Sequence, residues 1–324
     1  MSYTPMTRSS CVSSANNLDN PDIFLLVLHL TSITGIPIYL YGFYCILVIT
    51  PPGMKSLKWI LFASHGFSCL LDACIGLVVD PYLYYPTMAG HMLGIIDSPV
   101  QIFVSLSLLA VVGVTIMTVF ENRYYILYGE QKKWWSKVRK PFLAANFLLA
   151  AVSTTPAILT IPDQDLAFEI VSKSLPCQPE RFLNNRKIFI LAVDYTIPLF
   201  CGGLMTTVIF WEIVGFSGTI FWKIAYGRRT AALTSSKNTI NLQNRMVFAL
   251  SIQMLIPFLM AILPLIYPFL AICLNYHNQW LNNAVVCICA LHGFVSSIIM
   301  VLVHQPYRKT TLRMLHNVFL FCCK

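Results

Sequence analysis

Residues 99–120 read PVQIFVSLSLLAVVGVTIMTVF, and none of them carries a charge. A helix needs about twenty apolar residues to cross roughly 30 Å of hydrocarbon, so this stretch predicts a membrane span. Residues 121–140 follow it and read ENRYYILYGEQKKWWSKVRK, with lysines and arginines set among tyrosines and tryptophans. Basic side chains and interfacial aromatic rings mark the cytoplasmic end of a span, from which the topology of the whole chain follows.

The composition of the whole chain is that of a membrane protein. Only 11% of its 324 residues are charged and 57% are hydrophobic, with a mean hydropathy of +0.68. A soluble domain is about one quarter charged. The net charge of +9 is spread between apolar runs and does not gather in one soluble patch. We therefore expect the lipid bilayer as a partner and no nucleic acid.

Seven apolar runs predict an all-α membrane protein built as a seven-helix transmembrane bundle. The runs cover about residues 22–50, 60–81, 99–120, 141–161, 188–211, 246–272 and 281–303. Residues 1–21 are then a short extracellular N-terminal segment, and residues 304–324 are a cytoplasmic tail.

The distribution of basic residues predicts the orientation of this bundle. Of the 22 Lys and Arg residues, 17 lie in the first, third and fifth connections and the C-terminal tail. The remaining 5 lie in the N-terminal segment and the other connections. Loops rich in Lys and Arg stay in the cytoplasm, so we expect the N-terminus outside and the C-terminus inside.

The C-terminal tail predicts a short amphipathic helix on the inner leaflet. Apolar side chains at 312, 315, 319 and 322 share one helical face, and polar side chains at 309, 313 and 317 share another. Cys322 and Cys323 at its end are candidate lipidation sites, with unmodified interfacial cysteines as the alternative.

The spacing of cysteines and histidines matches neither a catalytic nor a metal site. The 11 cysteines form no CxxC pair, and the 7 histidines form no HExxH motif. We expect no enzyme activity, no metal and no cofactor.

Four motifs in order carry a resemblance to a known family. They are LLDACIGLVVDPYLYYP at 70–86, ENRYY at 121–125, NRMVFALSIQMLIP at 244–257 and HQPYR at 304–308. Together they resemble nematode serpentine chemoreceptors, particularly class H, over almost the whole chain. The resemblance implies a G-protein-coupled receptor at the plasma membrane, displayed on sensory-neuron cilia. It also implies a small-molecule ligand and a heterotrimeric G protein as partners.

The ENRYY motif is a candidate for coupling to the G protein. Rhodopsin-like receptors place an acid, an arginine and a tyrosine here, so the resemblance assigns this role to Glu121, Arg123 and Tyr124. An asparagine separates Glu121 from Arg123, and side chains two apart on a helix do not face each other. The sequence therefore does not predict an ion pair between them. An arginine that extends to lipid phosphates is the alternative for Arg123.

Asp72 is expected near the middle of the membrane, where an ionisable side chain costs roughly 2.5 to 3.5 kcal/mol and usually faces the bundle interior. It is a candidate structural hub of hydrogen bonds, a candidate activation switch sensitive to ions, or a transport site. The polar side chains expected at a similar depth are Ser105, Ser107, His292, Ser296 and Ser297.

Polar side chains in the outer parts of the spans are candidate contacts for a small organic ligand. They are Gln101 in span three, Asp194 and Tyr195 in span five, and Tyr267 in span six. The short outer connections favour a site within the bundle, where pockets are mostly apolar with a few polar groups. Packing or interfacial anchoring is the alternative for the tyrosines.

A ligand-gated channel or a small-solute transporter is the alternative function. It needs a polar path across the bilayer, and Asp72 is the only acid that the predicted spans put near the midplane.

Overall fold

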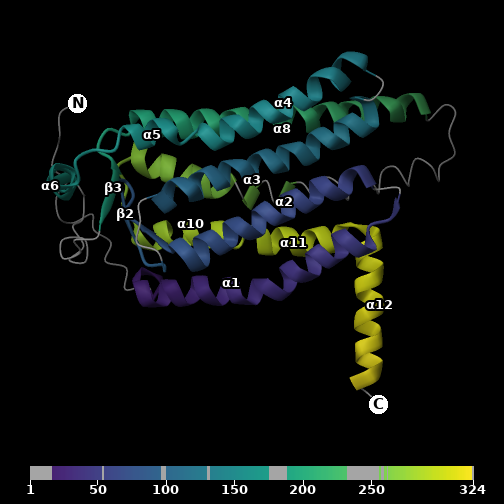
Figure 1. Ribbon diagram of the computed structural model, residues 1–324, viewed down its shortest axis with the longest axis horizontal. Helices are drawn as coiled ribbons and strands as arrows, with labels where there is room; N and C mark the ends of the chain where they lie inside the picture. The colour runs from purple at the N-terminus through teal and green to yellow at the C-terminus, as the bar shows by residue number, and fades with distance from the viewer. Residues whose placement is uncertain are drawn as a thin grey trace.

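The computed structural model describes residues 17–52, 55–95, 100–129, 132–174, 188–231, 255–256, 259–260 and 262–322. Its long helices run side by side along one axis (Figure 1). A small β-sheet lies at one end of this bundle, and the helix α12 leaves the bundle at the other end (Figure 1). We call these the sheet end and the α12 end.

Apolar helices make up the bundle. They are α1 (Pro21–Tyr44) with the π-helix η3 (Cys45–Ile49), α2 (Lys55–Ala73) with η5 (Cys74–Val79), α3 (Val100–Tyr124) with η6 (Tyr125–Gly129), α4 (Lys133–Val152) with α5 (Thr155–Leu159), α8 (Thr196–Ala231), Ile262–Cys273, α10 (Gln279–Ala290) and α11 (His292–Val303). Among the described residues, five helices are long and apolar enough to cross a membrane, and α10 with α11 makes a sixth span bent by 42°. The predicted class of helical membrane protein is confirmed. Residues 246–254, 257–258 and 261 of the predicted span 246–272 lie outside the described residues.

Helix α3 is the central helix of the bundle. Every residue from Val114 to Asn122 is buried, including polar ones, and a helix that is buried all round is enclosed by other helices. Half of the most apolar window of α3 is buried, against 17% for α4 and for α8. Helices α4 and α8 therefore lie at the periphery.

Residues 125–129 and 133–140 of the basic stretch after α3 are helical, whereas the sequence predicted a connection there. Helix α3 continues through η6 to Gly129, and α4 begins at Lys133, eight residues before the predicted start of span four at Pro141. The buried side chains of α4 explain its early start. Trp135 and Asn146 recur at helical spacing on the face that packs inward, so the helix already buries a face in its first turn.

A three-stranded antiparallel sheet, which the sequence analysis did not predict, covers one end of the bundle. Its order is β1 (Pro81–Leu83), β2 (Met88–Met92) and β3 (Phe189–Ala192). Tyr82 pairs with His91, and Ala89 pairs with Ile190. Span five was expected to start at residue 188, but that segment is β3, and α8 starts only at Thr196.

The later start of α8 changes the position of Glu212. This acid lies well inside the candidate span Thr196–Lys223, and its Oε1 accepts a hydrogen bond of 3.1 Å from Asn146 Nδ2 on α4. Asp72 is therefore not the only acid that lies well inside a candidate span.

The C-terminal segment forms the helix α12 (Gln305–Cys322), which runs across the direction of the bundle (Figure 1). The N-terminal part of α12 is hydrogen-bonded to α1 and to Thr50, which follows η3. Tyr41 Oη lies 2.6 Å from Thr311 Oγ1, and Thr50 Oγ1 lies 2.6 Å from Tyr307 Oη. Cys323 and the side chain of Cys322 lie outside the described part of the chain. Two shorter elements complete the fold, η2 (Asn17–Asp19) and α6 (Gln164–Ser174).

Candidate functional site

Asp72 is fully buried, and its carboxylate accepts three hydrogen bonds from neutral donors. Tyr39 Oη donates to Oδ2 at 2.5 Å, the backbone N–H of Phe294 donates to Oδ2 at 3.0 Å, and the backbone N–H of Gly293 donates to Oδ1 at 3.1 Å. The aspartate therefore joins α1, α2 and α11.

The two backbone donors belong to the first turn of α11, directly after the bend in span seven. The first N–H groups of a helix have no partner within the helix, and a carboxylate satisfies them while favouring the positive end of the helix dipole. A side chain at Gly293 does not fit this contact, because its Cβ would lie 2.7 Å from Asp72 Oδ2 and 2.9 Å from the carbonyl oxygen of Ser68. Asp72 and Gly293 together hold the bent span against α2.

Three of the five partners predicted for Asp72 contact other groups. Ser297 Oγ lies 3.3 Å from His65 Nδ1, Ser105 Oγ donates to the carbonyl oxygen of Gln101 at 2.8 Å, and Ser107 Oγ lies 2.7 Å from Thr154 Oγ1. The sequence analysis considered only side chains at a matching depth, whereas two of the three actual donors are backbone groups freed by a helix break.

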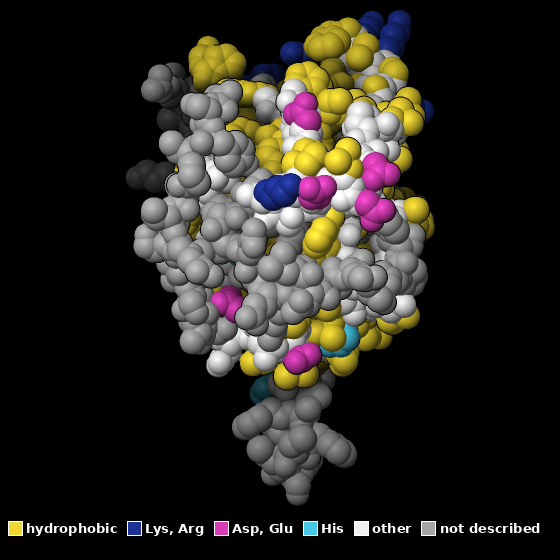
Figure 2. Space-filling model, turned by 90° about the vertical axis from the view of Figure 1, so that its left-hand side faces the viewer, with side chains coloured by type: hydrophobic (Ala, Val, Ile, Leu, Met, Phe, Trp, Pro, Cys, Tyr) yellow, Lys and Arg dark blue, Asp and Glu magenta, His cyan; other side chains and the backbone are white. Residues whose placement is uncertain are grey.

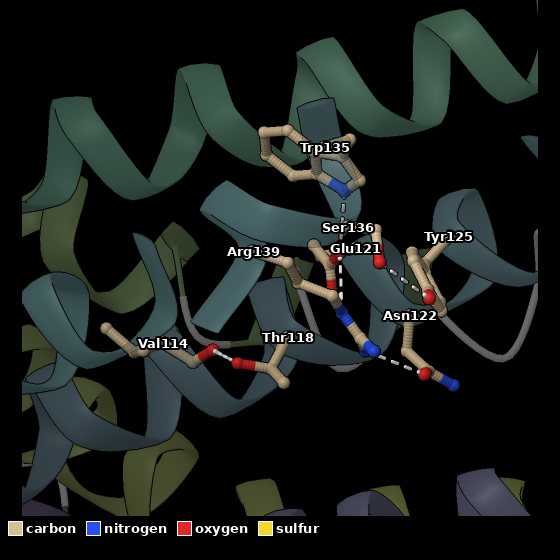
Figure 3. A network of polar contacts seen from close by, with 8 residues as sticks. All are labelled: Val114, Thr118, Glu121, Asn122, Tyr125, Trp135, Ser136 and Arg139. Atoms are coloured by element: carbon tan, nitrogen blue, oxygen red, sulfur yellow. Dashed lines mark hydrogen bonds and ion pairs between the residues drawn. The ribbon is translucent and has the colours of Figure 1, made fainter. Parts of the chain in front are cut away.

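Glu121 at the end of α3 is also fully buried, but its partners are on α4. Arg139 Nε donates to both carboxylate oxygens, at 2.8 and 2.9 Å, and Trp135 Nε1 donates to Oε1 at 3.0 Å. Arg139 Nη2 also donates to Asn122 Oδ1 at 2.9 Å. Figure 3 shows Trp135 and Arg139 pointing from α4 toward these acceptors on α3. An ion pair therefore joins the two helices.

Aromatic rings pack around this ion pair, in which Glu121 is fully buried and the Arg139 side chain is 20% exposed. The Trp135 ring contacts Tyr124, Phe142 and Phe216, with centroid distances of 6.0, 5.5 and 5.8 Å. The Arg139 guanidinium also lies 4.3 Å from the centroid of Tyr125. Tyr124, which the resemblance assigned to coupling, is thus a buried packing residue between α3, α4 and α8.

Arg123 forms no ion pair with Glu121, whose partner is Arg139, as the spacing of the motif indicated. Its Nε is buried and has no hydrogen-bond partner within the described residues. Burial and, to a smaller extent, the nearby Arg123 guanidinium lower the pKa of His304 to about 4, and the guanidinium also lies near Tyr307. The ENRYY and HQPYR motifs, far apart in the sequence, therefore meet at the α12 end.

The four predicted ligand contacts lie toward the sheet end. Gln101 is buried in the first turn of α3. Asp194 is exposed and precedes α8, where its Oδ1 accepts hydrogen bonds from the hydroxyl and the N–H of Thr196 at 2.7 and 3.0 Å, which lower its pKa. Its predicted place within span five is wrong, and the same holds for its neighbour Tyr195. Tyr267 Oη donates to Asn282 Oδ1 at 2.7 Å, so it already binds span seven.

The start of span seven anchors the sheet, which sequence reasoning missed. Asn282 Nδ2 donates to the carbonyl oxygens of Leu83 and Tyr85, both at 3.3 Å, and Gln279 Nε2 donates to Leu83 at 3.0 Å. Asn282 itself is fully buried. The sequence feature that could have indicated this anchor is the polar run NQWLNN at 278–283, at the start of an otherwise apolar span.

Comparisons with known proteins show the family to which the chain belongs. Residues 19–317 match the family model described as serpentine type 7TM GPCR chemoreceptor Srh. The chain is also similar to serpentine receptor class H-72 of Caenorhabditis elegans, with 24% identity over 313 residues that cover 94% of this chain and 89% of the relative. Because the family model spans nearly all of the helical bundle, this chain belongs to the Srh family of serpentine seven-transmembrane G-protein-coupled chemoreceptors.

Proposed function

We propose that this receptor binds a small organic ligand within the bundle near the sheet end and activates a heterotrimeric G protein at the α12 end. In this proposal the N-terminus and the sheet face the outside and α12 lies on the cytoplasmic leaflet. Membership of a chemoreceptor family supports display at the plasma membrane, including that of sensory-neuron cilia.

The charges at the two ends support this orientation. Acidic side chains at the sheet end include Asp163, Asp165 and Asp194, and Figure 2 shows such side chains on this face. Most of the Lys and Arg side chains in that view lie at its far upper edge. The α12 end has basic residues on α4 and on α12, and Lys and Arg favour the cytoplasmic side.

The observation that carries the coupling proposal is the arrangement around Arg123. Arg139 satisfies the carboxylate of Glu121, so Glu121 does not neutralise Arg123. Among the described residues no acidic side chain pairs with Arg123, and its partly buried guanidinium is unfavourable without one. A carboxylate or carbonyl group of an intracellular protein would supply a partner. The contact of Arg123 with the HQPYR segment also lets a shift of span seven change its position.

For the ligand, we propose Gln101, Asp194, Tyr195 and Tyr267 as contacts, with Gln101 the foremost. It is the buried polar side chain at the start of the central helix. Tyr267 binds Asn282, which in turn binds the sheet, so a ligand that displaces this hydroxyl would also disturb the start of span seven.

The test is heterologous expression with a screen of small organic compounds and paired readouts of G-protein activation and membrane current. We expect compounds that activate a G protein, and a Gln101→Leu variant that needs higher concentrations at equal surface expression. A ligand-evoked current that persists without any G protein would favour the channel or transporter and overturn the proposal.

An epitope tag at each terminus tests the orientation in the same cells. The N-terminal tag should be accessible on intact cells and the C-terminal tag only after permeabilisation. The opposite labelling would place α12 outside and exclude coupling at that end.

A further inference from the structure

Three lysines form an exposed row on the first turns of α4. Lys133, Lys137 and Lys140 are all exposed, and their spacing of four and three residues puts them on one side of the helix. We call them the lysine stripe. The fourth basic residue in these turns, Arg139, points to the opposite side and is neutralised by Glu121. The stripe is therefore free of the ion pair that joins α3 and α4.

The same side of α4 becomes apolar directly after the stripe. Leu148, eight residues beyond Lys140, continues this side and is 66% exposed, and the candidate span runs on to Leu159. At 1.5 Å per residue the stripe is about 10 Å long, and the apolar part from residue 141 to Leu159 is about 27 Å long. These lengths match a layer of lipid headgroups next to a hydrocarbon core of roughly 30 Å.

The charges at the start of α4 disfavour the helix itself and favour an anion. Residues 132–140 include no acidic side chain, and Lys132 at the N-cap makes no capping hydrogen bond. Positive side chains oppose the dipole at a helix N-terminus, where the unpaired N–H groups attract negative groups. Trp134, beside the stripe, is 58% exposed, as expected of a side chain at the level of the headgroups.

We propose that the lysine stripe binds the headgroups of anionic phospholipids in the leaflet next to the α12 end. The ammonium groups pair with phosphate oxygens, and the apolar side of α4 receives the acyl chains of the same lipids. A soluble partner fits less well, because the face that presents the lysines continues into the hydrocarbon.

Photocrosslinking tests the proposal on the full-length receptor in vesicles with the same lipid composition in both leaflets. The probes are a photoreactive phosphatidylserine, a photoreactive phosphoinositide and a photoreactive phosphatidylcholine, each at the same mole fraction. Mass spectrometry of the peptide that contains residues 133–152 gives the labelling of α4. Because both leaflets have the same lipids, the result does not depend on the orientation of the receptor in the bilayer. The proposal can therefore be tested independently of the proposed function.

We expect the anionic probes to label this peptide at least tenfold more than phosphatidylcholine. Each lysine near an anionic surface contributes about fivefold in binding, so K133Q/K137Q/K140Q should reduce the preference by tenfold or more. The triple Lys→Arg variant should retain it. The matched control R308Q/K309Q/R313Q removes three exposed basic residues from α12 and should leave the labelling of α4 unchanged.

Equal labelling by all three lipids would show that the lysines only extend to any headgroup and would overturn the proposal. Loss of the preference in the Lys→Arg variant, or in the α12 control, would also contradict it. Soluble inositol phosphate is added as a competitor at the same concentration as the anionic lipid. If it removes the labelling of α4 by the anionic probes, the stripe is a site for free phosphate instead. Unchanged elution of each variant in size-exclusion chromatography confirms that its fold is intact.

Discussion

Of the three fully buried carboxylates among the described residues, Asp72 and Glu121 are satisfied in opposite ways. Asp72, between α1, α2 and α11, accepts hydrogen bonds from a tyrosine and two backbone N–H groups, without a basic partner in the described part of the chain. Glu121, between α3 and α4, is paired with the guanidinium of Arg139. The first acid stabilises a bend in a span, and the second joins two neighbouring helices.

This difference matters for function because it determines which charged side chains remain available to bind a partner protein. The described hydrogen-bond donors to Asp72 come from Tyr39 on α1 and from the first turn of α11. A change in the bend of span seven therefore breaks hydrogen bonds to Asp72. At the α12 end the pairing of Glu121 with Arg139 leaves Arg123 for another partner. The first region is suited to respond to a movement of span seven, and the second to present a cation.

The largest expected effect comes from breaking the ion pair between α3 and α4. Arg139→Leu leaves the buried Glu121 carboxylate without its cation, which typically costs about 3 to 5 kcal/mol. We expect strongly reduced surface expression and a lower melting temperature in detergent. The double variant E121L/R139L removes both charges and should recover much of the loss, as replacement of a buried pair by apolar residues is often neutral. Equal defects in the single and double variants would show that the pair does not set the stability of this junction.

A smaller effect is expected at Asp72. Asp72→Asn keeps the shape, but its amide NH₂ must face either the N–H of Gly293 or the donors of Phe294 and Tyr39, so at least one hydrogen bond is lost. Leaving a buried donor unpaired costs about 1 to 3 kcal/mol. Gly293→Ala perturbs the same contact by overpacking and should cost a similar 1 to 3 kcal/mol, by roughly the range seen in packed cores.

Thermal unfolding of both variants measures this loss. If Asp72→Asn unfolds at the same temperature as the wild type, the carboxylate does not hold the start of α11. Normal unfolding together with lost signalling would instead favour the switch hypothesis for Asp72.

The smallest effect concerns the sheet end, where a buried histidine stays neutral. Burial between Tyr82 and Tyr84 lowers the pKa of His91 to about 4. Because this pKa lies below the ordinary value of about 6.5, the sheet is stable above pH 6.5 and should loosen as the pH falls toward 4. Burial raises the pKa of Asp80, which acts in the opposite direction.

Hydrogen exchange of the strand amides, corrected for its intrinsic dependence on pH, measures this loosening. His91→Phe keeps the ring stacking and should remove most of the dependence on acid. An unchanged pH profile in that variant would assign the effect to another group.

The long helices were predictable from the sequence, because uncharged runs of about twenty residues have few alternatives. The strands were not. PYL, MAGHM and FILA are too short to show an alternating pattern, and FILA at 189–192 merges with the apolar run of α8. Their pairing depends on segments about a hundred residues apart and on anchors from span seven.

The candidate site was predictable only in part. The spacing of Glu121 and Arg123 correctly indicated that they do not pair. Their actual surroundings depend on the start of α4 and on the bend of span seven, which no local motif marks. One sequence pattern indicates the partner of Glu121. Trp135, Arg139 and Phe142 recur at helical spacing, although the many charges of this stretch are typical of a loop.

The most direct test of the account compares Arg123→Gln with Arg308→Gln in a G-protein activation assay at matched surface expression. Both variants remove one positive charge at the α12 end, but Arg308 is exposed on α12, whereas Arg123 Nε is buried and has no hydrogen-bond partner in the described part of the chain. A charged hydrogen bond to a partner contributes about 1.5 to 3 kcal/mol, so Arg123→Gln should lower activation roughly tenfold or more while Arg308→Gln stays near wild type. Equal activation by Arg123→Gln and the wild type would contradict the claim that this arginine couples the receptor to its G protein.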